Sequence, residues 1–452
     1  AIRAFADAGG TVSADLAPLD GLSDLDTLPS NELITNAVLD GAGVLQIDEN
    51  GSITAVDLSG LVNIDPAALY DNFGWVGASD PVTTPRTLSD PRASKTLQIV
   101  EAATSNVFEV DFNRIEPGTL ITNIPITITE PGNYYLIHSL TNTVNNADGI
   151  TIDADNVTLD LMGYRIVGGN FSGTASDDGI FVSGTQTNIK IRNGSVIGWD
   201  GDGINALNAD FSIFTDLRVS QNDGDGLVTD FNCIIDSCTA FSNGFDGLEG
   251  DDGTVIHNST AGQNDDNGIQ TSEGCVVRLC ASFDNGSDGF DIAAGSVIRE
   301  CTATDNGIFG FDIALGSMAT SCTAYDNMSN GFDMASACIL RDCISSLNTG
   351  HGVRTFANSY VTDSKFHEND LDGIRISSTD VFAAHNQTTD NDQTGISATA
   401  SGSLIVANTC AGNLTNYNID PNCAFGPIID VTNAGDLSLI AGADHPWANF
   451  SY

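Results

Sequence analysis

The chain has 452 residues, of which 41% are hydrophobic, with 47 Gly and 12 Pro. This composition is typical of a folded protein, and the length allows one large unit plus smaller regions. With 60 acidic residues against 15 basic ones the formal net charge is −45, which repels phosphates and anionic lipid headgroups and so excludes nucleic acid as a partner. Because no apolar run approaches the roughly 18 residues of a transmembrane helix, we expect no membrane insertion.

The N-terminal part, residues 1–120, lies outside any repeat and is rich in Asp, Leu, Thr and Pro. Within it, residues 31–63 alternate apolar and polar side chains around Gly and Asn-Gly turns, which predicts β-hairpins. This stretch resembles short β segments of trimeric fibre shafts. The first 30 residues have too little periodic apolar content to form a core. We therefore expect an extended arm, and self-association of the chain through residues 1–100.

From residue 149 onward a short motif recurs, with Asn or Asp, then Gly, then a large apolar residue. In the central run it returns every 21 residues, at Gly226, Gly247, Gly268, Gly289, Gly310, Gly331, Gly352 and Gly373. Twenty-one residues hold three short strands and three turns, but no helix. Because the same residue types recur at the same position of each repeat, each strand is predicted to pair in parallel with its copy in the next repeat, about 4.8 Å away. Connections between parallel strands of one sheet are right-handed.

The sequence therefore predicts an all-β fold, a right-handed parallel β-helix over residues 146–425 with about eleven to twelve coils. Strand alternation places Phe290 and Ile292 inside and Asp291 outside. One turn column consists of asparagines whose amides are expected to bond from coil to coil as a structural ladder, namely Asn243, Asn264, Asn285, Asn306, Asn327 and Asn348. Most of the cysteines are expected to be small buried thiols. Cys410 and Cys423 are the candidates for a disulfide.

Two segments lead into the repeat, ITITEPGNYYLIHSL (126–140) and NVTLDLMGYRIVGG (156–169). Together with the coil repeat and the stacked Asn turn, they make residues 120–425 resemble the pectate-lyase-like superfamily of secreted parallel β-helix proteins. That resemblance specifies a fold and leaves the activity open, because its members include polysaccharide lyases, glycosidases, epimerases, phage tailspikes and adhesins. We expect residues 121–145 to cap the start of the solenoid and residues 426–452 to form a C-terminal capping tail.

An outward column two residues after each glycine carries the candidate chemistry. It contains Glu249, Gln270, Asp291, Asp312, Asp333, Arg354 and Arg375. Aspartates about 5 Å apart raise one another's pKa or share a cation. The catalytic candidates are Asp291, Asp312, Asp333, Arg354 and Arg375, and the substrate-binding candidates are Glu249, His351, Lys365 and His367. By the resemblance, clustered Asp serves hydrolases, whereas basic residues beside carboxylates serve lyases and epimerases on anionic sugars.

The regularity of the repeat argues against an enzyme. From Gly226 to Gly373 there is no insertion, so no loop walls a cleft, and an acidic chain places Asp in outward columns by composition alone. The leading interpretation is an extracellular or cell-surface structural protein, a fibre, filament or adhesive subunit that assembles through its N-terminal arm. The alternative is a secreted lyase, glycoside hydrolase or epimerase that acts on anionic glycans, or a carbohydrate-binding module without turnover.

Two Asp-Gly-Asp-Gly runs are candidates for metal binding. Their carboxylates are Asp200, Asp202, Asp223 and Asp225. Hard oxygen ligands suit Ca²⁺, although the runs lack the complete pattern of a calcium loop. We expect no required cofactor, with Ca²⁺ as the metal that these residues could hold.

Overall fold

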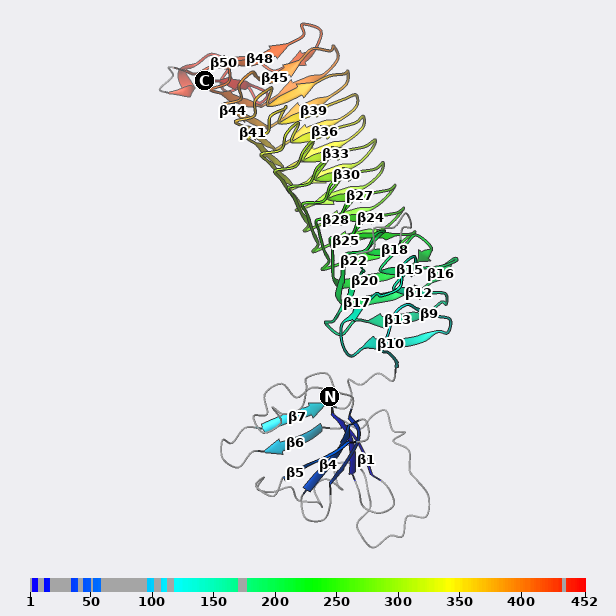
Figure 1. Cartoon of the computed structure of the whole chain (residues 1–452). Coiled ribbons are helices and arrows are strands. Elements are labelled where there is room, and N and C mark those ends of the chain that lie inside the picture. The colour runs from blue at the N-terminus through cyan, green and yellow to red at the C-terminus, as the bar shows by residue number, and fades with distance from the viewer. Residues whose placement is uncertain are drawn as a thin grey trace. The chain divides into compact units, whose positions relative to one another are not determined.

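The chain separates into two units, Ala1–Pro117 and Gly118–Tyr452. The computed structural model describes residues 118–169, 177–432 and 436–452 in full, and in residues 1–117 seven strands without their side chains (Figure 1). Within these described parts, no helix is long and apolar enough to cross a membrane.

The strands of the first unit pair antiparallel. They are β1 (Ile2–Ala6), β2 (Val12–Leu16), β3 (Ile34–Leu39), β4 (Val44–Glu49), β5 (Ser52–Asp57), β6 (Thr96–Val100) and β7 (Val107–Asp111). β1 pairs with β2, β4 pairs with both β3 and β5, and β6 pairs with β7. The β3–β5 pairings lie in the stretch where alternation predicted hairpins. The expected role of residues 1–100 in self-association falls outside the described residues.

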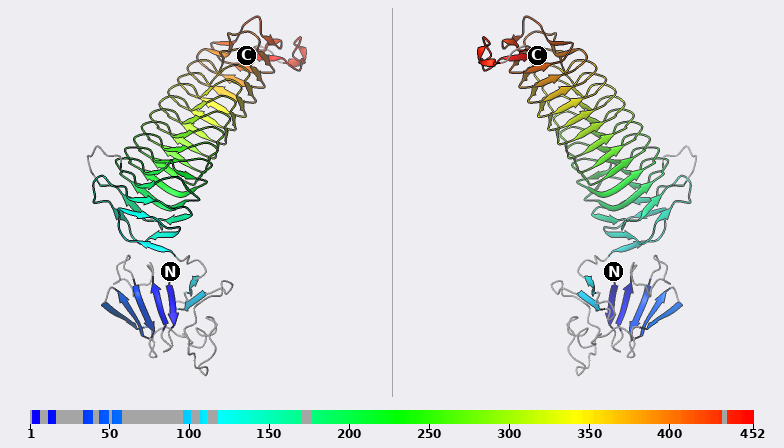
Figure 2. Two further views of the ribbon diagram at one scale, coloured as in Figure 1. Left: turned by 90° about the vertical axis from the view of Figure 1, so that its right-hand side faces the viewer. Right: turned by 90° about the vertical axis from the view of Figure 1, so that its left-hand side faces the viewer.

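The second unit is a solenoid whose strands all stack in parallel, coil upon coil (Figure 2). One side, here called sheet 1, takes one strand from each coil. Its strands are β9 (Ile126–Ile128), β12 (Ile150–Ile152), β15 (Ile180–Val182), β18 (Ile204–Ala206), β21 (Leu227–Thr229), β24 (Leu248–Gly250), β27 (Ile269–Thr271), β30 (Phe290–Ile292), β33 (Phe311–Ile313), β36 (Phe332–Met334), β39 (Val353–Thr355), β42 (Ile374–Ile376), β45 (Thr394–Ala398) and β48 (Thr415–Ile419).

The remaining sides, here called sheet 2, take two strands from most coils. The first stack is β8 (Thr119–Ile121), β10 (Gly132–Leu136), β13 (Val157–Asp160), β17 (Lys190–Ile197), β20 (Ile213–Ser220), β22 (Ile234–Asp236), β25 (Val255–His257), β28 (Val276–Arg278), β31 (Val297–Arg299), β34 (Met318–Thr320), β37 (Ile339–Arg341), β40 (Tyr360–Thr362), β43 (Phe382–Ala384), β46 (Leu404–Val406) and β49 (Ala424–Phe425). The long strands β17 and β20 belong to both stacks.

The second stack is β11 (Leu140–Thr141), β14 (Arg165–Val167), then β17 and β20, then β23 (Thr239–Phe241), β26 (Thr260–Gly262), β29 (Ala281–Phe283), β32 (Thr302–Thr304), β35 (Thr323–Tyr325), β38 (Ile344–Ser346), β41 (Lys365–His367), β44 (Gln387–Thr389), β47 (Thr409–Ala411), β51 (Asn449–Ser451) and β50 (Ile428–Asp430). A small pair, β16 (Gln186–Thr187) with β19 (Ala209–Asp210), and a 3₁₀ helix, Leu437–Leu439, complete the described elements.

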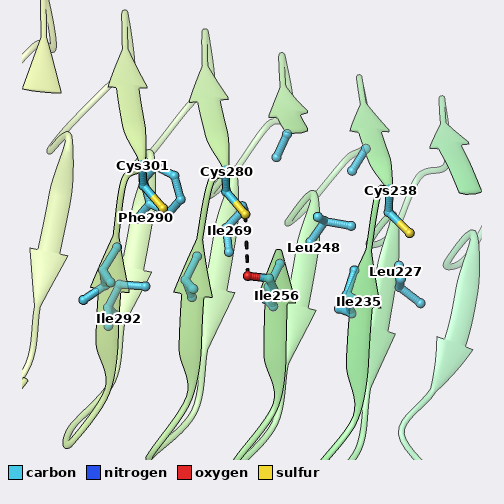
Figure 3. Close-up of a cluster of buried hydrophobic side chains, with 14 of the residues drawn as sticks. Leu227, Ile235, Cys238, Leu248, Ile256, Ile269, Cys280, Phe290, Ile292 and Cys301 are labelled. Atoms are coloured by element: carbon cyan, nitrogen blue, oxygen red, sulfur yellow. Dashed lines mark hydrogen bonds between the residues drawn. The ribbon is translucent and has the colours of Figure 1, made fainter. Parts of the chain in front are cut away.

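The interior consists of like residues stacked on like. Phe290, Phe311 and Phe332 are fully buried, and their rings stack with centroids 4.7 and 4.9 Å apart. Across from sheet 1, thiols such as Cys280 and Cys301 point inward from successive coils (Figure 3). Burying such side chains supplies most of the stability, at about 1.5–3 kcal/mol for each large one.

All ten cysteines are free and buried. The two expected disulfide partners face different groups. Cys410 Sγ accepts a hydrogen bond from Thr388 Oγ1 at 2.9 Å, and Cys423 Sγ donates to the carbonyl oxygen of Ala400 at 3.1 Å.

The asparagine column forms a continuous ladder of side-chain amides. Asn243 Nδ2 donates to Asn264 Oδ1 at 2.9 Å, and the same bond recurs from Asn222 to Asn369 at 2.8–2.9 Å. These amides are at most 2% exposed. The ladder therefore satisfies polar groups that the narrow coil buries at each turn, where an unpaired amide would cost about 1–3 kcal/mol.

The solenoid is longer than the sequence predicted. Sheet 1 contains fourteen strands, whereas the repeat indicated about eleven to twelve coils. The difference lies at the ends, where the strict period is lost. Residues 121–145, expected as a cap, supply β9, β10 and β11 and so build the first coil. Residues 426–452, expected as a capping tail, return to pair β51 with β47 and β50.

Candidate functional site

Each strand of sheet 1 is placed by the glycine that precedes it. A Cβ at Gly289 would lie 2.7 Å from the carbonyl oxygen of Gly310 and 2.9 Å from the Cβ of Ala303. Only glycine permits this close approach between coils. Gly289 is followed by an inward, an outward and an inward residue. Phe290 and Ile292 are therefore buried, and Asp291 faces out as predicted.

The outward column keeps its register from coil to coil. Asp291 pairs with Asp312, Asp312 with Asp333, and Asp333 with Arg354, after which Arg354 pairs with Arg375. The five catalytic candidates therefore lie in one line on the outward side of sheet 1. Neighbouring members are about 4.8 Å apart, the spacing of adjacent strands.

Asp312 lies between two carboxylates, and this position changes its titration. Burial raises its pKa to about 6, and the charges of Asp291 and Asp333 act in the same direction. Arg354 opposes them. The guanidinium of Arg354 binds Asp333 in a bidentate pair, with Nε to Oδ1 and Nη2 to Oδ2 both at 2.6 Å. A carboxyl whose pKa is raised to about 6 thus stands beside a carboxyl that is paired with a guanidinium through both oxygens.

His351 lies next to this line, in the position just before its glycine. The backbone N–H of Asp372 donates to His351 Nδ1 at 3.1 Å, so that this nitrogen carries no proton. Burial lowers the pKa of His351, and the approach of Asp372 Oδ2 to Nδ1 at 3.6 Å is therefore not a charged pair. Arg375 Nη1 reaches Asp372 Oδ2 at 3.4 Å and Ser397 Oγ at 3.0 Å.

Two of the predicted substrate-binding residues are elsewhere. Lys365 and His367 are in β41 of sheet 2, and His367 Nε2 lies 3.6 Å from Glu368 Oε2. The structure does not bring them to the Asp291–Arg375 line, because eleven residues past Arg354 the coil has already turned to another side. Glu249 does lie in the outward column of sheet 1, three coils before Asp312.

A second column lies just before the glycines, and the sequence predicted roles only for three of its members, Asp202 and Asp225 as metal ligands and His351 in substrate binding. We call it the pre-glycine column. Its members are Asp148, Asp178, Asp202, Asp225, Asp246, Asn267, Asp288, Phe309, Asn330, His351 and Asp372. Most of its carboxylates accept the backbone N–H of the next member, as Asp225 Oδ1 does from Asp246 and Asp246 Oδ1 from Asn267, both at 2.8 Å. The signal in the sequence was the recurring Asn or Asp before Gly, which marks the whole column and not only the two Asp-Gly-Asp-Gly runs.

Burial dominates the electrostatics of the pre-glycine column. It raises the pKa of Asp178, Asp225, Asp246 and Asp288 to about 7, and nearby carboxylates add to the shift in each case. The backbone hydrogen bonds to these carboxylates act in the opposite direction. Stacked carboxylates with little opposing positive charge therefore follow sheet 1 through its first half.

Two members of the pre-glycine column and one of the outward column place three carboxylates where a cation could be held. Ligand atoms of Asp225, Asp246 and Glu249 all lie within 4.8 Å of one another. Of the four predicted metal ligands only Asp225 belongs to this group. Asp202 instead receives N–H bonds from Asp225 and from Asn205 Nδ2, and Asp200 and Asp223 lie outside the column. An all-oxygen set of carboxylates fits Ca²⁺ better than a transition metal.

Comparison with known proteins identifies the fold. Residues 178–327 and 270–380 match the family model described as a right-handed beta helix region. The A-module of the Azotobacter vinelandii mannuronan C-5 epimerase AlgE6 is 17% identical and covers 65% of this chain and 89% of its own, with a TM-score of 0.49. For the AlgE4 A-module of the same organism the values are 16%, 66%, 91% and 0.47.

Pectate lyase Pel9A is 18% identical over 62% of this chain and 71% of its own, with a TM-score of 0.33. No curated protein matches the sequence. Likenesses this distant say nothing of activity. Together with the parallel stacking of every described coil, the match to the family model shows that the second unit folds as a right-handed parallel β-helix.

Proposed function

We propose that the protein is an extracellular enzyme that cleaves a polysaccharide on the outward side of sheet 1, with Asp312 as the proton donor. The observation that carries this proposal is the pairing of unlike carboxyls. Asp312 has a pKa of about 6, whereas its neighbour Asp333 binds Arg354 through both oxygens. Environments that separate two carboxyls in this way assign one as acid and the other as base.

Glycoside hydrolysis needs such a pair on either side of the scissile bond. The half-buried Asp312 would protonate the leaving oxygen. Asp333 on the next coil lies about 4.8 Å away, close to the roughly 5–5.5 Å of enzymes that retain anomeric configuration. Asp291 and Asp333, two coils apart, are separated by about 9.6 Å, at the upper end of the inverting range. Retained configuration in the first product would fit Asp312 acting with either neighbour, whereas inverted configuration would fit the pair Asp291 and Asp333 and would count against Asp312 as the acid.

The basic end of the line would hold a negatively charged substituent of the sugar. The side chains of Arg354 and Arg375 are about one third exposed, at 38% and 34%. They are the basic residues of sheet 1 among those that the structure describes. An otherwise acidic surface that carries guanidinium groups at one point fits an anionic glycan bound there.

A lyase or epimerase reaction would need a base other than His351. Because Nδ1 accepts the backbone N–H of Asp372, the neutral ring carries its proton on Nε2, where it can donate but cannot remove the proton next to a sugar carboxylate. The hypothesis of a structural subunit depends on residues 1–100, whose side chains lie outside the described parts, and it remains a prediction.

The test is an assay of the full chain on neutral, uronic-acid and sulfated glycans, followed for new reducing ends and for absorbance of unsaturated products. We expect Asp312→Asn to lower turnover by about 10²–10⁴-fold, the usual effect of losing a general acid. Asp326→Asn is the matched control, since Asp326 has a positive φ of 55° that asparagine tolerates and lies outside sheet 1. Full activity of Asp312→Asn, or no product from any glycan, would contradict the proposal.

A further inference from the structure

The outward side of sheet 2 carries a continuous apolar column. It occupies the first position of the strands in the first stack on ten successive coils. Its members are Ile213, Ile234, Val255, Val276, Val297, Met318, Ile339, Tyr360, Phe382 and Leu404, here called the apolar stripe. Each strand turns its middle residue inward, so that the stripe faces away from the core.

The stripe is accessible in the described structure. Ile234, Ile339, Tyr360 and Leu404 are 37%, 39%, 50% and 40% exposed, and the other members are half-buried by their neighbours along the column. The rings of Tyr360 and Phe382 lie 5.8 Å apart on adjacent coils. Soluble proteins rarely leave a contiguous apolar surface of this length unless something binds it.

We propose that the apolar stripe is the surface through which two copies of this chain associate side by side. Charge is the first argument. A chain with a net charge of −45 repels its own copies except where negative charge is sparse or opposed. In the described residues the basic side chains gather on sheet 2, in Arg165, Lys190, Arg192, Arg218, Arg278, Arg299, Arg341 and Lys365.

The residues on either side of the stripe also support association of two copies through it. Arg278, Arg299 and Arg341 are exposed two residues from it. The adjacent outward position in the second stack is largely uncharged, with Thr239, Thr260, Thr302 and Thr323. Exposed turn acids stand beside these arginines, with Asp342 Oδ2 3.5 Å from Arg341 Nε. Charges of both signs on this flank of the stripe can therefore pair with those of a second copy, whereas the carboxylate line of sheet 1 could not approach its own copy in this way.

The dimensions suit a stable contact. Nine intervals of about 4.8 Å give the stripe a length of about 43 Å, and the two three-residue strands of each coil, at 3.3 Å per residue, give the part of sheet 2 that contains it a width of roughly 20 Å. The resulting area is on the order of 900 Å² per copy, close to the ~800 Å² of a standard interface. Because both copies repeat at the same interval, their side chains interdigitate along the whole stripe.

The experiment uses the full chain. Sedimentation velocity over a wide concentration range should show an oligomer, and Ile339→Lys with Tyr360→Lys should weaken its association at least tenfold. Ile339→Thr with Tyr360→Thr is the milder version, should the lysines disturb folding. Asn418→Lys is the matched control, because Asn418 is exposed in the outward column of sheet 1; it should leave association unchanged.

A second measurement separates this surface from association through residues 1–117. Met318→Cys should cross-link to its copy with a bismaleimide, whereas Asn418→Cys should not, and the native thiols are buried. A monomeric wild type, equal cross-linking at both positions, or an oligomer unchanged by the lysine variant would overturn the proposal. A lysine variant that loses glycan binding but sediments with an unchanged oligomer mass would overturn the proposal as well, because the stripe would then bind a sugar.

Discussion

The outward sides of sheet 1 and sheet 2 pass through the same coils and carry opposite chemistry. From Glu249 to Arg375 the outward column of sheet 1 is polar or charged in every coil. Across the same coils the apolar stripe of sheet 2 carries no charge at all. The interior behind both is of one kind, stacked aliphatic, phenyl and thiol groups. The repeat therefore constrains what faces inward, and each outward column is free to serve a separate purpose.

The largest expected effect separates inward from outward residues on one strand. Phe311 is fully buried between two other phenyl rings, so Phe311→Ala should lower the free energy of unfolding by about 3–5 kcal/mol. Asp312→Asn, one residue further, should change it by less than about 1 kcal/mol. Urea denaturation followed by circular dichroism measures both. Equal losses for the two variants would show that the outward column is part of the core.

The next largest effect is the stability gained when Ca²⁺ binds the carboxylates on the side of sheet 1. At pH 8, above the pKa of about 7 of Asp225 and Asp246, Ca²⁺ in 100-fold excess over its Kd should add about 2.7 kcal/mol of stability by mass action. Glu249→Gln should remove most of that gain, and Gln270→Glu, one coil later, should not. Calorimetry with and without chelator is the measurement. A gain that survives Glu249→Gln would place the ion elsewhere.

The pH dependence of stability tests the pre-glycine column. A carboxyl titrates near 3.8 in the unfolded chain, whereas burial raises the pKa of Asp288 to about 7. Between these values the unfolded state loses its proton first. The free energy of unfolding should therefore fall as the pH rises from about 4 to about 7, and stay low above that.

Asp288→Asn should make that fall shallower, since Asp178, Asp225 and Asp246 titrate in the same range, and should raise the Tm at pH 8 by on the order of 3 °C. Asn267 and Asn330 in the same column already accept the corresponding backbone N–H bonds, so the exchange keeps the local geometry. Asp326→Asn, away from the column, serves as the control. An unchanged profile for Asp288→Asn would mean that this carboxyl is not the titrating group.

The smallest effect concerns the pair between Arg354 and Asp333. Since the charge of Arg354 lowers the pKa of Asp312, Arg354→Met should raise that pKa further, and Arg354→Lys should leave it nearly unchanged. Stability should change by less than about 1 kcal/mol, because the guanidinium is partly exposed. Carboxyl NMR titration follows Asp312 directly. A shift of equal size in both variants would point to packing and not to charge.

The sequence predicted the solenoid well because every coil repeats the same solution. The inward Phe290 and Ile292, the outward Asp291 and the asparagine ladder all follow from a period of 21 residues and strand alternation. The ends were predicted less well, because Ile126 and Thr415 begin strands without the strict spacing that marks the central coils.

The candidate site was predicted in part, for a related reason. The line from Asp291 to Arg375 follows from register alone. Lys365 and His367 were placed with this line only because they are near it in sequence. Half a coil separates them from Arg354, so they lie on sheet 2. Whether an Asp before glycine faces solvent or caps a backbone N–H depends on the turn, which residue types do not reveal. Asp246 could therefore be recognised as buried only in three dimensions.

At the last coil, the acceptor that continues one column of side chains comes from strand β51. Along the column that holds Cys343 and Ser364, Asn386 and Asn408 continue from coil to coil, and the final acceptor is Asn449, 41 residues after Asn408. Strand β51 at the same time occupies the open edge of β47. The return of the chain thus covers the edge of the second stack of sheet 2 at this end, whereas β48 stays the last strand of sheet 1.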